Sequence, residues 1–333
     1  MDTRFSRFVK ESPGRLAMPL DAYAGLAITG ESVEDLVSVP STQFKAVMAL
    51  HDRYQTRVLL TATDPSAEAE AFGCEVKMTA RDVPTVVGRR VTCADDIASL
   101  PDVVPGDART RVPIETAWRL TAESEEGTPV LGAMLGPFSL ACRLYGVSEA
   151  VEAAASREPE TIEALLDVVT GFLCRYALAF RETGAWGVIV AEPETGQLSQ
   201  AGLGHFSAPF VKRIVKAVET PDFAVIYHAR GAKIDHLESV LESGAGVYHF
   251  GPPMDIAAAL ARVDPEVVLC GNLDAQALFH KGTPQSVGDA VRALLEATRD
   301  HRNFVISSGG DIPPAAPLAN LNAFYRAVSE FNK

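Results

Sequence analysis

The sequence lacks any uninterrupted apolar stretch near the ~18 residues that a membrane-spanning helix needs. Its start, Met1–Lys10, is charged and has no apolar core of the kind found in secretion signals. Its five cysteines show no Cys-x-x-Cys spacing, so no disulfide framework is predicted. We therefore expect a cytoplasmic protein with no membrane association.

Positive charge is scarce as well, because 30 Lys and Arg stand against 43 Asp and Glu, a formal net charge of −13. Such a surface repels phosphate groups, so nucleic acid is not expected as a partner. The sequence also has no Gly-x-Ser-x-Gly, P-loop or His-Glu-x-x-His motif, and no Gly-x-Gly-x-x-Gly follows its first apolar run. These absences leave no familiar nucleophile motif and count against a dinucleotide-binding fold.

What the sequence does contain is a regular alternation of apolar runs and segments with helical spacing. The runs predict eight strands, at residues 15–20, 57–62, 128–135, 185–191, 222–227, 246–250, 266–269 and 303–308. Strands that alternate with helices predict a parallel sheet. Eight such units in 333 residues favour an α/β fold of one domain, a closed (β/α)8 TIM-type barrel with an N-terminal extension, over an open sheet.

Two further segments have a clear local signature. Residues 74–78 and 85–91 predict a β excursion outside the barrel. Residues 284–301 predict a long amphipathic helix, with Thr283 as its N-cap and Pro284 at its first position.

The last apolar run ends in Ser307-Ser308-Gly309-Gly310, followed by Asp311. The two glycines let the backbone approach a neighbour closely or adopt positive φ, and Pro313-Pro314 disfavour an immediate helix. A buried strand that stops at a glycine turn beside a carboxylate is how an α/β enzyme presents a site. A plain strand–turn–helix connection is the alternative interpretation.

Polar residues follow most of the predicted strands. In a barrel the carboxyl ends of the strands form the active-site rim. The residues at these ends are Asp64, Glu192, Glu194, His228, Arg230, His249, Asn272, Asp274 and Asp311. Any single one could be a helix cap or a solvated loop residue, and Asn272 and Asp274 are also typical turn formers. Their convergence on one rim favours a functional site.

His228 is the strongest single candidate for a functional residue, since an imidazole at a strand end can bind a metal or transfer protons near neutral pH. A satisfied structural histidine is the alternative. Arg230 suits a carboxylate or phosphate, or pairing with a rim acid such as Glu192. Arg143 is predicted to be a solvated helix residue, and Cys270 to be inert packing.

Several segments, in the right order, resemble the uroporphyrinogen decarboxylase superfamily, closest to its branch of zinc-dependent corrinoid methyltransferases. These segments are residues 64–76, 136–140, 196–199, 271–274 and 307–314, and the resemblance runs from about residue 40 to the C-terminus. It implies the barrel and a methyl group moved between a corrinoid, carried by a partner protein, and a small methyl acceptor. Nothing in the sequence determines the oligomeric state, and a homodimer is compatible with it.

The chain departs from the methyltransferase branch at its zinc site. That branch bears His-x-Cys after the fifth strand and another Cys after the eighth, and zinc on such ligands activates a thiol. Here His228 is present, but Arg230 and Gly310 stand at the two cysteine positions. The usual zinc site is therefore not expected, and His228 with Glu192 or another rim acid is the remaining hypothesis for a metal.

The chain also departs from the decarboxylase branch. Asp64 falls near that branch's catalytic aspartate, but the arginine-rich N-terminal motif that binds the substrate carboxylates is missing. Gly310 occupies the place of that branch's histidine, and only Arg143 and Arg230 are left as partial substitutes. Decarboxylation of uroporphyrinogen itself is not expected.

Three hypotheses follow: a corrinoid-linked methyltransferase, a decarboxylase of a small or tetrapyrrole carboxylic acid, and a barrel that binds a tetrapyrrole or partner without turnover. The catalytic candidates are Asp64, Glu192, His228 and Asp311. The candidates for binding substrate or cofactor are Arg230, Asn272, Asp274, His249, Ser307 and Gly309.

Overall fold

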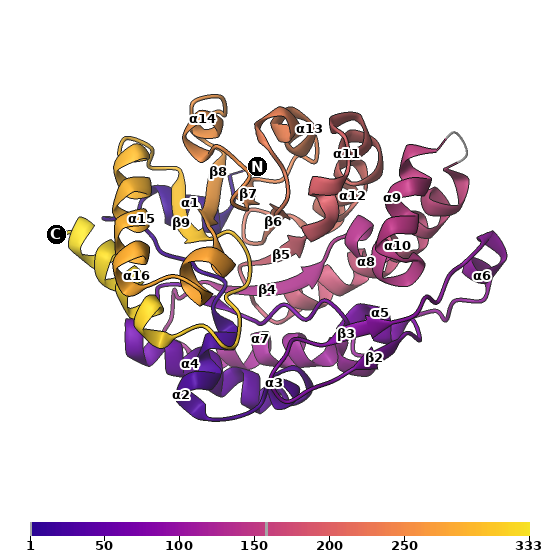
Figure 1. The fold of residues 1–333 in the computed structure, drawn as a ribbon, viewed down its shortest axis with the longest axis horizontal. Helices are drawn as coiled ribbons and strands as arrows, with labels where there is room; N and C mark the ends of the chain where they lie inside the picture. The colour runs from indigo at the N-terminus through magenta and orange to yellow at the C-terminus, as the bar shows by residue number, and fades with distance from the viewer. Residues whose placement is uncertain (1, 157–158) are drawn as a thin grey trace.

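A curled parallel sheet forms the centre of the computed structural model, which describes residues 2–156 and 159–333 (Figure 1). Its seven strands follow the order β1-β4-β5-β6-β7-β8-β9, so each one pairs with the next along the chain. They are β1 Leu59–Leu60, β4 Val130–Leu135, β5 Gly187–Ala191, β6 Ala224–Ala229, β7 Val247–Phe250, β8 Val268–Leu273 and β9 Phe304–Ser308. The predicted alternation of strands and helices and the barrel-type fold are confirmed.

Helices surround the outer face of this sheet (Figure 1). They are α1 Arg4–Lys10, α2 Leu26–Thr29, α3 Val33–Ser38, α4 Pro40–Tyr54, α5 Ala67–Ala71, α6 Ala94–Ala98, α7 Arg111–Glu123, α8 Pro137–Tyr145, α9 Val147–Ala155, α10 Glu160–Glu182, α11 Gln200–Phe206, α12 Ala208–Val218, α13 Leu237–Leu241, α14 Ile256–Leu260, α15 Pro284–Ala297 and α16 Leu318–Phe331. α15 begins as predicted, because the Thr283 hydroxyl accepts a hydrogen bond from the Ser286 amide and Pro284 is its first residue. In residues 2–156 and 159–333, no helix is long and apolar enough to cross a membrane.

The predicted β excursion is a separate antiparallel hairpin of β2 Glu75–Lys77 and β3 Thr85–Val87. The predicted strand at 15–20 is only partly formed. Within the described residues it joins the sheet by a single bridge, Ala17 to Ile306 beside β9. The reason lies in the residues that follow: Pro19 has no amide hydrogen to donate, and the Leu20 amide donates to the Ser308 hydroxyl at 2.9 Å.

The strands divide the core into two hydrophobic clusters. Successive side chains of a strand point to opposite faces, so Ile189 lies in the inner cluster while Val188 and Val190 lie in the outer one. The outer cluster packs the sheet against the helices, and the inner cluster fills the barrel. Each fully buried aliphatic or aromatic side chain contributes about 1.5–3 kcal/mol, so both clusters stabilise the curled sheet.

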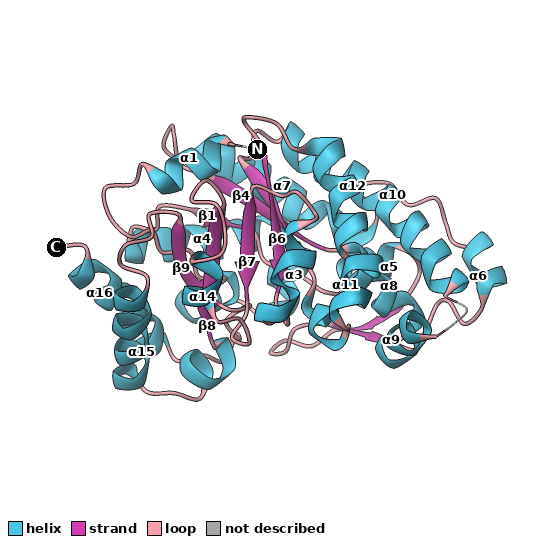
Figure 2. Ribbon diagram, turned by 90° about the horizontal axis from the view of Figure 1, so that it is seen from above, coloured by secondary structure: helices cyan, strands magenta, loops and turns pink. Residues whose placement is uncertain are grey.

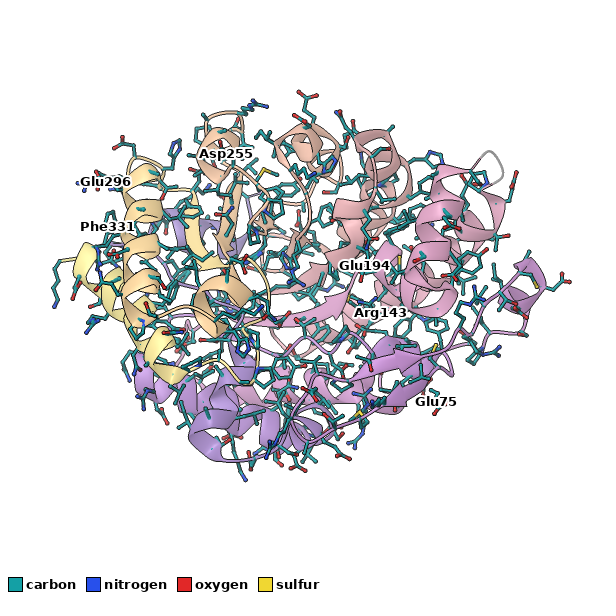
Figure 3. All side chains as sticks on the ribbon, viewed as in Figure 1. Glu75, Arg143, Glu194, Asp255, Glu296 and Phe331 are labelled. Atoms are coloured by element: carbon teal, nitrogen blue, oxygen red, sulfur yellow. The ribbon has the colours of Figure 1, made fainter. Side chains whose placement is uncertain are left out.

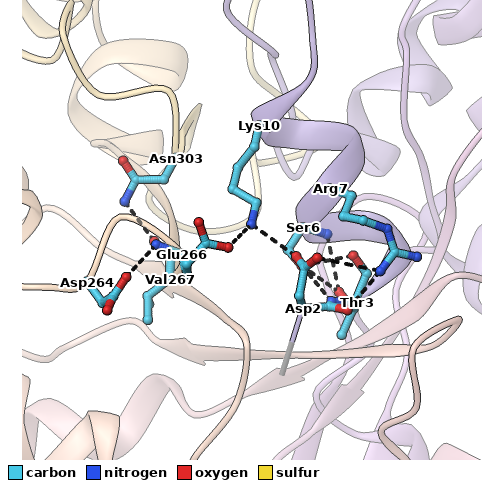
Figure 4. Close-up of polar contacts among 9 residues, drawn as sticks. All are labelled: Asp2, Thr3, Ser6, Arg7, Lys10, Asp264, Glu266, Val267 and Asn303. Atoms are coloured by element: carbon cyan, nitrogen blue, oxygen red, sulfur yellow. Dashed lines mark hydrogen bonds and ion pairs between the residues drawn. The ribbon is translucent and has the colours of Figure 1, made fainter.

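Helix α1 closes the barrel at the amino ends of the strands (Figure 2). Phe5 and Val9 insert into the inner cluster with 0% and 3% of their surface exposed. The Arg4 amide donates to the Pro221 carbonyl, just ahead of β6, at 2.6 Å. At the end of the helix, Lys10 forms ion pairs with Asp2 and with Glu266, the latter just ahead of β8 (Figure 4).

Candidate active site

A pocket of about 290 Å³ opens at the carboxyl ends of the strands, the opposite end from α1. Its charged and imidazole side chains come from α8, from the segment after β5, from the end of β6 and from the turn after β9. They are Arg143, Glu194, His228, Arg230 and Asp311. The structure therefore brings four of the predicted rim residues together and adds Arg143.

His228 is the end of a buried row of polar side chains. Its Nδ1 lies 2.8 Å from His249 Nδ1 and 3.3 Å from the His249 carbonyl oxygen. His249 Nε2 lies 2.8 Å from the Ser307 hydroxyl. Burial lowers the pKa of His228 to about 4, against the opposing effect of the hydrogen bond with the His249 carbonyl, and the positive charge of Arg230 lowers it further. Burial, and then His228, also hold the pKa of His249 well below its usual range, so both rings are neutral at neutral pH.

Arg230 is an exposed cation in the pocket wall, and no described side chain forms an ion pair or hydrogen bond with its guanidinium. A Cβ atom placed at Gly310 would lie 2.9 Å from Arg230 Nε. The guanidinium thus occupies the space that a side chain at position 310 would need. The glycine at 310 and the arginine at 230 are complementary.

Asp311 lies next to this cation. Removal from water raises the pKa of its carboxyl to about 6, although the charge of Arg230 and a hydrogen bond with the Thr63 side chain act in the opposite direction. A carboxyl with this pKa is mostly ionised at pH 7 and yet basic enough to accept a proton there.

Arg143 and Glu194 form a second charged group in the pocket (Figure 3). Arg143 Nη2 lies 2.6 Å from Glu194 Oε1, and the two side chains are 20% and 9% exposed. Glu194 Oε2 is buried and has no hydrogen-bond partner in the part of the chain that the structure describes. The prediction that Arg143 is solvated was wrong. Because α8 starts directly at the end of β4, its first turns lie on the rim.

Glu192 takes a different position from its neighbour Glu194 and does not line the pocket. Its carboxylate accepts hydrogen bonds from the amides of Phe138 and Ser139, at 2.9 and 2.7 Å, which are the first free amides of α8. A helix N-terminus attracts negative charge. Burial nevertheless raises the pKa of Glu192 to about 7, with these hydrogen bonds opposing it.

Asp64 is also held outside the pocket lining. It forms an ion pair with Arg109, and its other oxygen accepts from the amide and hydroxyl of Ser66, at 2.9 and 2.7 Å. Arg109 binds Glu70 as well, at 2.7 Å. The sequence analysis did not single out Arg109, which lies 45 residues from Asp64 in the chain, and no local signal marks it.

The other predicted residues hold the loops of the rim in place. Asn272 donates to the carbonyl oxygens of Met254 and Gly251, at 2.6 and 3.2 Å. Asp274 accepts from the Gln276 and Ala277 amides and so caps the turn that follows β8. At Gly309 a Cβ atom would lie 2.6 Å from the ring of Pro252, so this position requires glycine for close approach.

The model of the family described as uroporphyrinogen decarboxylase (URO-D) matches residues 19–331. The chain belongs to the uroporphyrinogen decarboxylase family. It is 27% identical over 271 residues to the methylcobamide:CoM methyltransferase MtbA of Methanosarcina acetivorans, covering 80% of this chain and 78% of the relative. It is 30% identical over 220 residues to the uroporphyrinogen decarboxylase of a Synechococcus species, covering 64% and 61%.

A solved structure of a methyltransferase from Methanosarcina mazei superposes over 100% of this chain and 99% of the other, with a TM-score of 0.81 and 19% identity. This likeness confirms the fold. The family thus contains both methyltransferases and decarboxylases, and the resemblance inferred from the strand-end motifs is confirmed.

The zinc site implied by the methyltransferase resemblance does not fit this uroporphyrinogen decarboxylase family member. Of the three ligand positions only His228 carries a zinc-binding side chain, and the guanidinium of Arg230 fills the space beside Gly310. Within residues 2–156 and 159–333, no three His, Cys, Asp or Glu side chains are grouped as metal ligands. The alternative pair of His228 and Glu192 gains no support, since both oxygens of Glu192 are bonded to α8.

Proposed function

We propose that this protein transfers a methyl group between a corrinoid, carried by a partner protein, and a small acceptor that bears an anionic group, without zinc. The observation that supports this proposal best is the unpaired guanidinium of Arg230 beside the carboxyl of Asp311 in a small pocket. The relatives named as methylcobamide:CoM and methylated-thiol–coenzyme M methyltransferases, at 27% and 25% identity, support methyl transfer.

The size of the pocket favours a small acceptor. Its volume of about 290 Å³ is at the lower end of the range of small-molecule sites, roughly 300–1,000 Å³. A tetrapyrrole ring does not fit inside such a volume together with a second substrate. We therefore expect the corrinoid to approach from the open mouth, with its methyl group directed at the acceptor below.

The residues of the pocket suit an acceptor of the thiol type. Arg230 would bind its anionic group, and Asp311 would remove the proton from the attacking sulfur. The corrinoid supplies an electrophilic methyl group. As the sulfur–carbon bond forms, the bond between the methyl group and the corrinoid breaks, and its electron pair stays with the corrinoid. The thiol proton passes to Asp311. Before transfer, the thiol would donate its hydrogen bond to His228 Nε2, and this bond would be released when the proton passes to Asp311.

Decarboxylation of a small acid is the second candidate, favoured by the same free guanidinium, which could hold a carboxylate. In this hypothesis Asp64 would stabilise the intermediate. The ion pair of Asp64 with Arg109 weighs against it, because that carboxylate would first have to leave its partner.

The experiment is anaerobic demethylation of methylcobalamin, followed by absorbance, with pairs of thiols that differ only in an anionic group, such as 2-mercaptoethanesulfonate and 2-mercaptoethanol. We expect turnover with the anionic member. Arg230→Gln should raise its KM about tenfold or more, since a hydrogen bond to a charged group contributes roughly 1.5–3 kcal/mol.

Arg302→Gln is the matched control, because Arg302 is an exposed arginine that lines a hollow at the other end of the barrel. If none of the thiol or folate acceptors tried supports demethylation of methylcobalamin, the proposal is overturned. Release of CO2 from a small acid, lost in Asp64→Asn, would favour the decarboxylase. Tight corrinoid binding with neither reaction would favour the non-catalytic barrel.

A further inference from the structure

The hydrogen bonds that link Ser307, His249 and His228 all donate in a defined direction. The groups at the two ends of this row determine that direction. All three side chains are buried, with 0%, 0% and 2% of their surface exposed. A neutral imidazole has one nitrogen that donates and one that accepts, so fixing one nitrogen of a ring fixes the other. In a buried row, the donor at one end therefore determines whether the last ring nitrogen at the other end is protonated.

At the first end, the Ser307 hydroxyl donates to backbone oxygen. It lies 2.6 Å from the Met18 carbonyl oxygen and 2.9 Å from that of Ser308, and carbonyl oxygens can only accept. With its single proton used there, Ser307 must accept from His249 Nε2, 2.8 Å away. Neutral His249 then carries its proton on Nε2 and has a bare Nδ1.

The other end gives the same answer independently. His228 Nδ1 lies 2.8 Å from His249 Nδ1 and 3.3 Å from the His249 carbonyl oxygen. If His228 Nδ1 is protonated, it donates to both of these acceptors. The opposite tautomer would turn a nitrogen lone pair towards a carbonyl oxygen in a buried place.

We infer that Ser307 and His249 are positioning residues that hold His228 in its Nδ1-protonated tautomer, so that an unprotonated Nε2 faces the pocket. The pocket then selects, at this point, a group that donates a hydrogen bond, such as a thiol, hydroxyl or amine. Neither positioning residue lines the pocket. The use of Nε2 in methyl transfer rests on the proposed function, whereas the tautomer is a property of this chain alone.

The experiment is ¹⁵N NMR of protein labelled at histidine, with His228 assigned by comparison with His228→Gln. Long-range ¹H–¹⁵N correlations distinguish a protonated from a bare ring nitrogen. We expect a bare Nε2 on His228 in the wild-type protein. A protonated Nε2 there would overturn the inference, whatever the result of the methyl-transfer assay.

Ser307→Ala removes the acceptor for His249 Nε2, while the His249 carbonyl oxygen still favours a protonated Nδ1 on His228. We therefore expect a mixture of tautomers, with a measurable fraction of His228 protonated on Nε2. Ser308→Ala is the matched control, since among the described residues the Ser308 hydroxyl accepts only from the Leu20 amide, outside this row. Ser307→Thr keeps a hydroxyl and should keep the wild-type spectrum. An unchanged tautomer in Ser307→Ala would show that Ser307 does not set it.

With an active acceptor in hand, kcat adds a second readout. We expect Ser307→Ala to lower kcat about 10- to 100-fold, by analogy with the range found for outer-shell partners of metal-ligating histidines, and Ser307→Thr to restore it. Loss of activity in Ser307→Ala with a wild-type tautomer would contradict the positioning role.

Discussion

The two ends of the barrel are built from the same strands in opposite ways. At the amino end, inward side chains such as Ala224 and Ile226 of β6 are apolar and pack against α1. Two residues further along the same face, β6 presents His228 to the pocket. In β7 and β9 the inward positions likewise change from Val247 to His249 and from Val305 to Ser307.

This difference separates stability from chemistry along a single strand. At the amino end, closely packed apolar side chains exclude water, and their burial stabilises the folded chain. The carboxyl end keeps polar groups at low exposure, where each must find a partner or a ligand. Glu194 Oε2 is a buried oxygen of the pocket that has no hydrogen-bond partner in the described residues, whereas the exposed guanidinium of Arg230 meets solvent.

The largest expected effect comes from converting the carboxyl end into a metal site. The double variant Arg230→Cys with Gly310→Cys removes the guanidinium and adds two thiolates near His228. We expect it to bind about one zinc per chain by elemental analysis, since three such ligands form a typical zinc site. Adding His228→Ala should abolish binding. A double variant without zinc would show that the three positions do not converge.

Phe5→Ala should weaken the packing at the amino end of the barrel and leave the pocket at the carboxyl end unchanged. Phe5 is fully buried in the inner cluster, and truncating such a side chain costs about 3–5 kcal/mol of unfolding free energy. Denaturant unfolding measures this loss. Lys10→Ala, which removes only ion pairs with exposed partners, is the control and should cost less than about 1 kcal/mol. A change in the His228 NMR signals of Phe5→Ala would contradict the separation of the two ends.

The third prediction concerns Glu68, a buried carboxyl at the carboxyl end. Its Oε1 accepts from the Leu135 amide at 2.8 Å, its Oε2 has no hydrogen-bond partner among the described residues, and burial raises its pKa to about 7. Because the pKa of Glu68 is higher in the folded than in the unfolded chain, its contribution to the free energy of unfolding is fully present below the unfolded pKa near 4.5. This contribution is lost as the pH rises through 7.

Glu68→Gln keeps the bond to Leu135 and removes the charge, so it should be more stable than wild type at pH 8 and no more stable at pH 4.5. The gain at pH 8 is at most about 3 kcal/mol, at 1.36 kcal/mol for each unit of pKa. Thermal unfolding at both pH values checks it, with the exposed Glu330→Gln as control. An equal effect at both pH values would mean that Glu68 is not protonated on folding.

Much of this molecule follows from local features of the sequence. An apolar run followed by glycine, proline or an acid predicts where a strand ends, and so seven strands and the rim residues His228, Arg230 and Asp311 were predicted correctly as neighbours at one end. Tight local turns also follow from residue type, as Asp274 shows by capping the turn after β8. The strand-end motifs, in their order along the chain, identified the family.

Which partner each rim side chain finds depended on the tertiary structure alone. Glu192 and Glu194 are two residues apart in the sequence, yet one caps α8 and the other enters the pocket with Arg143. Asp64 is held by an arginine 45 residues away, and Arg230 fills the space left by Gly310. Strand ends reflect the intrinsic preferences of adjacent residues, whereas these contacts are made through space between loops whose relative positions only the folded chain determines.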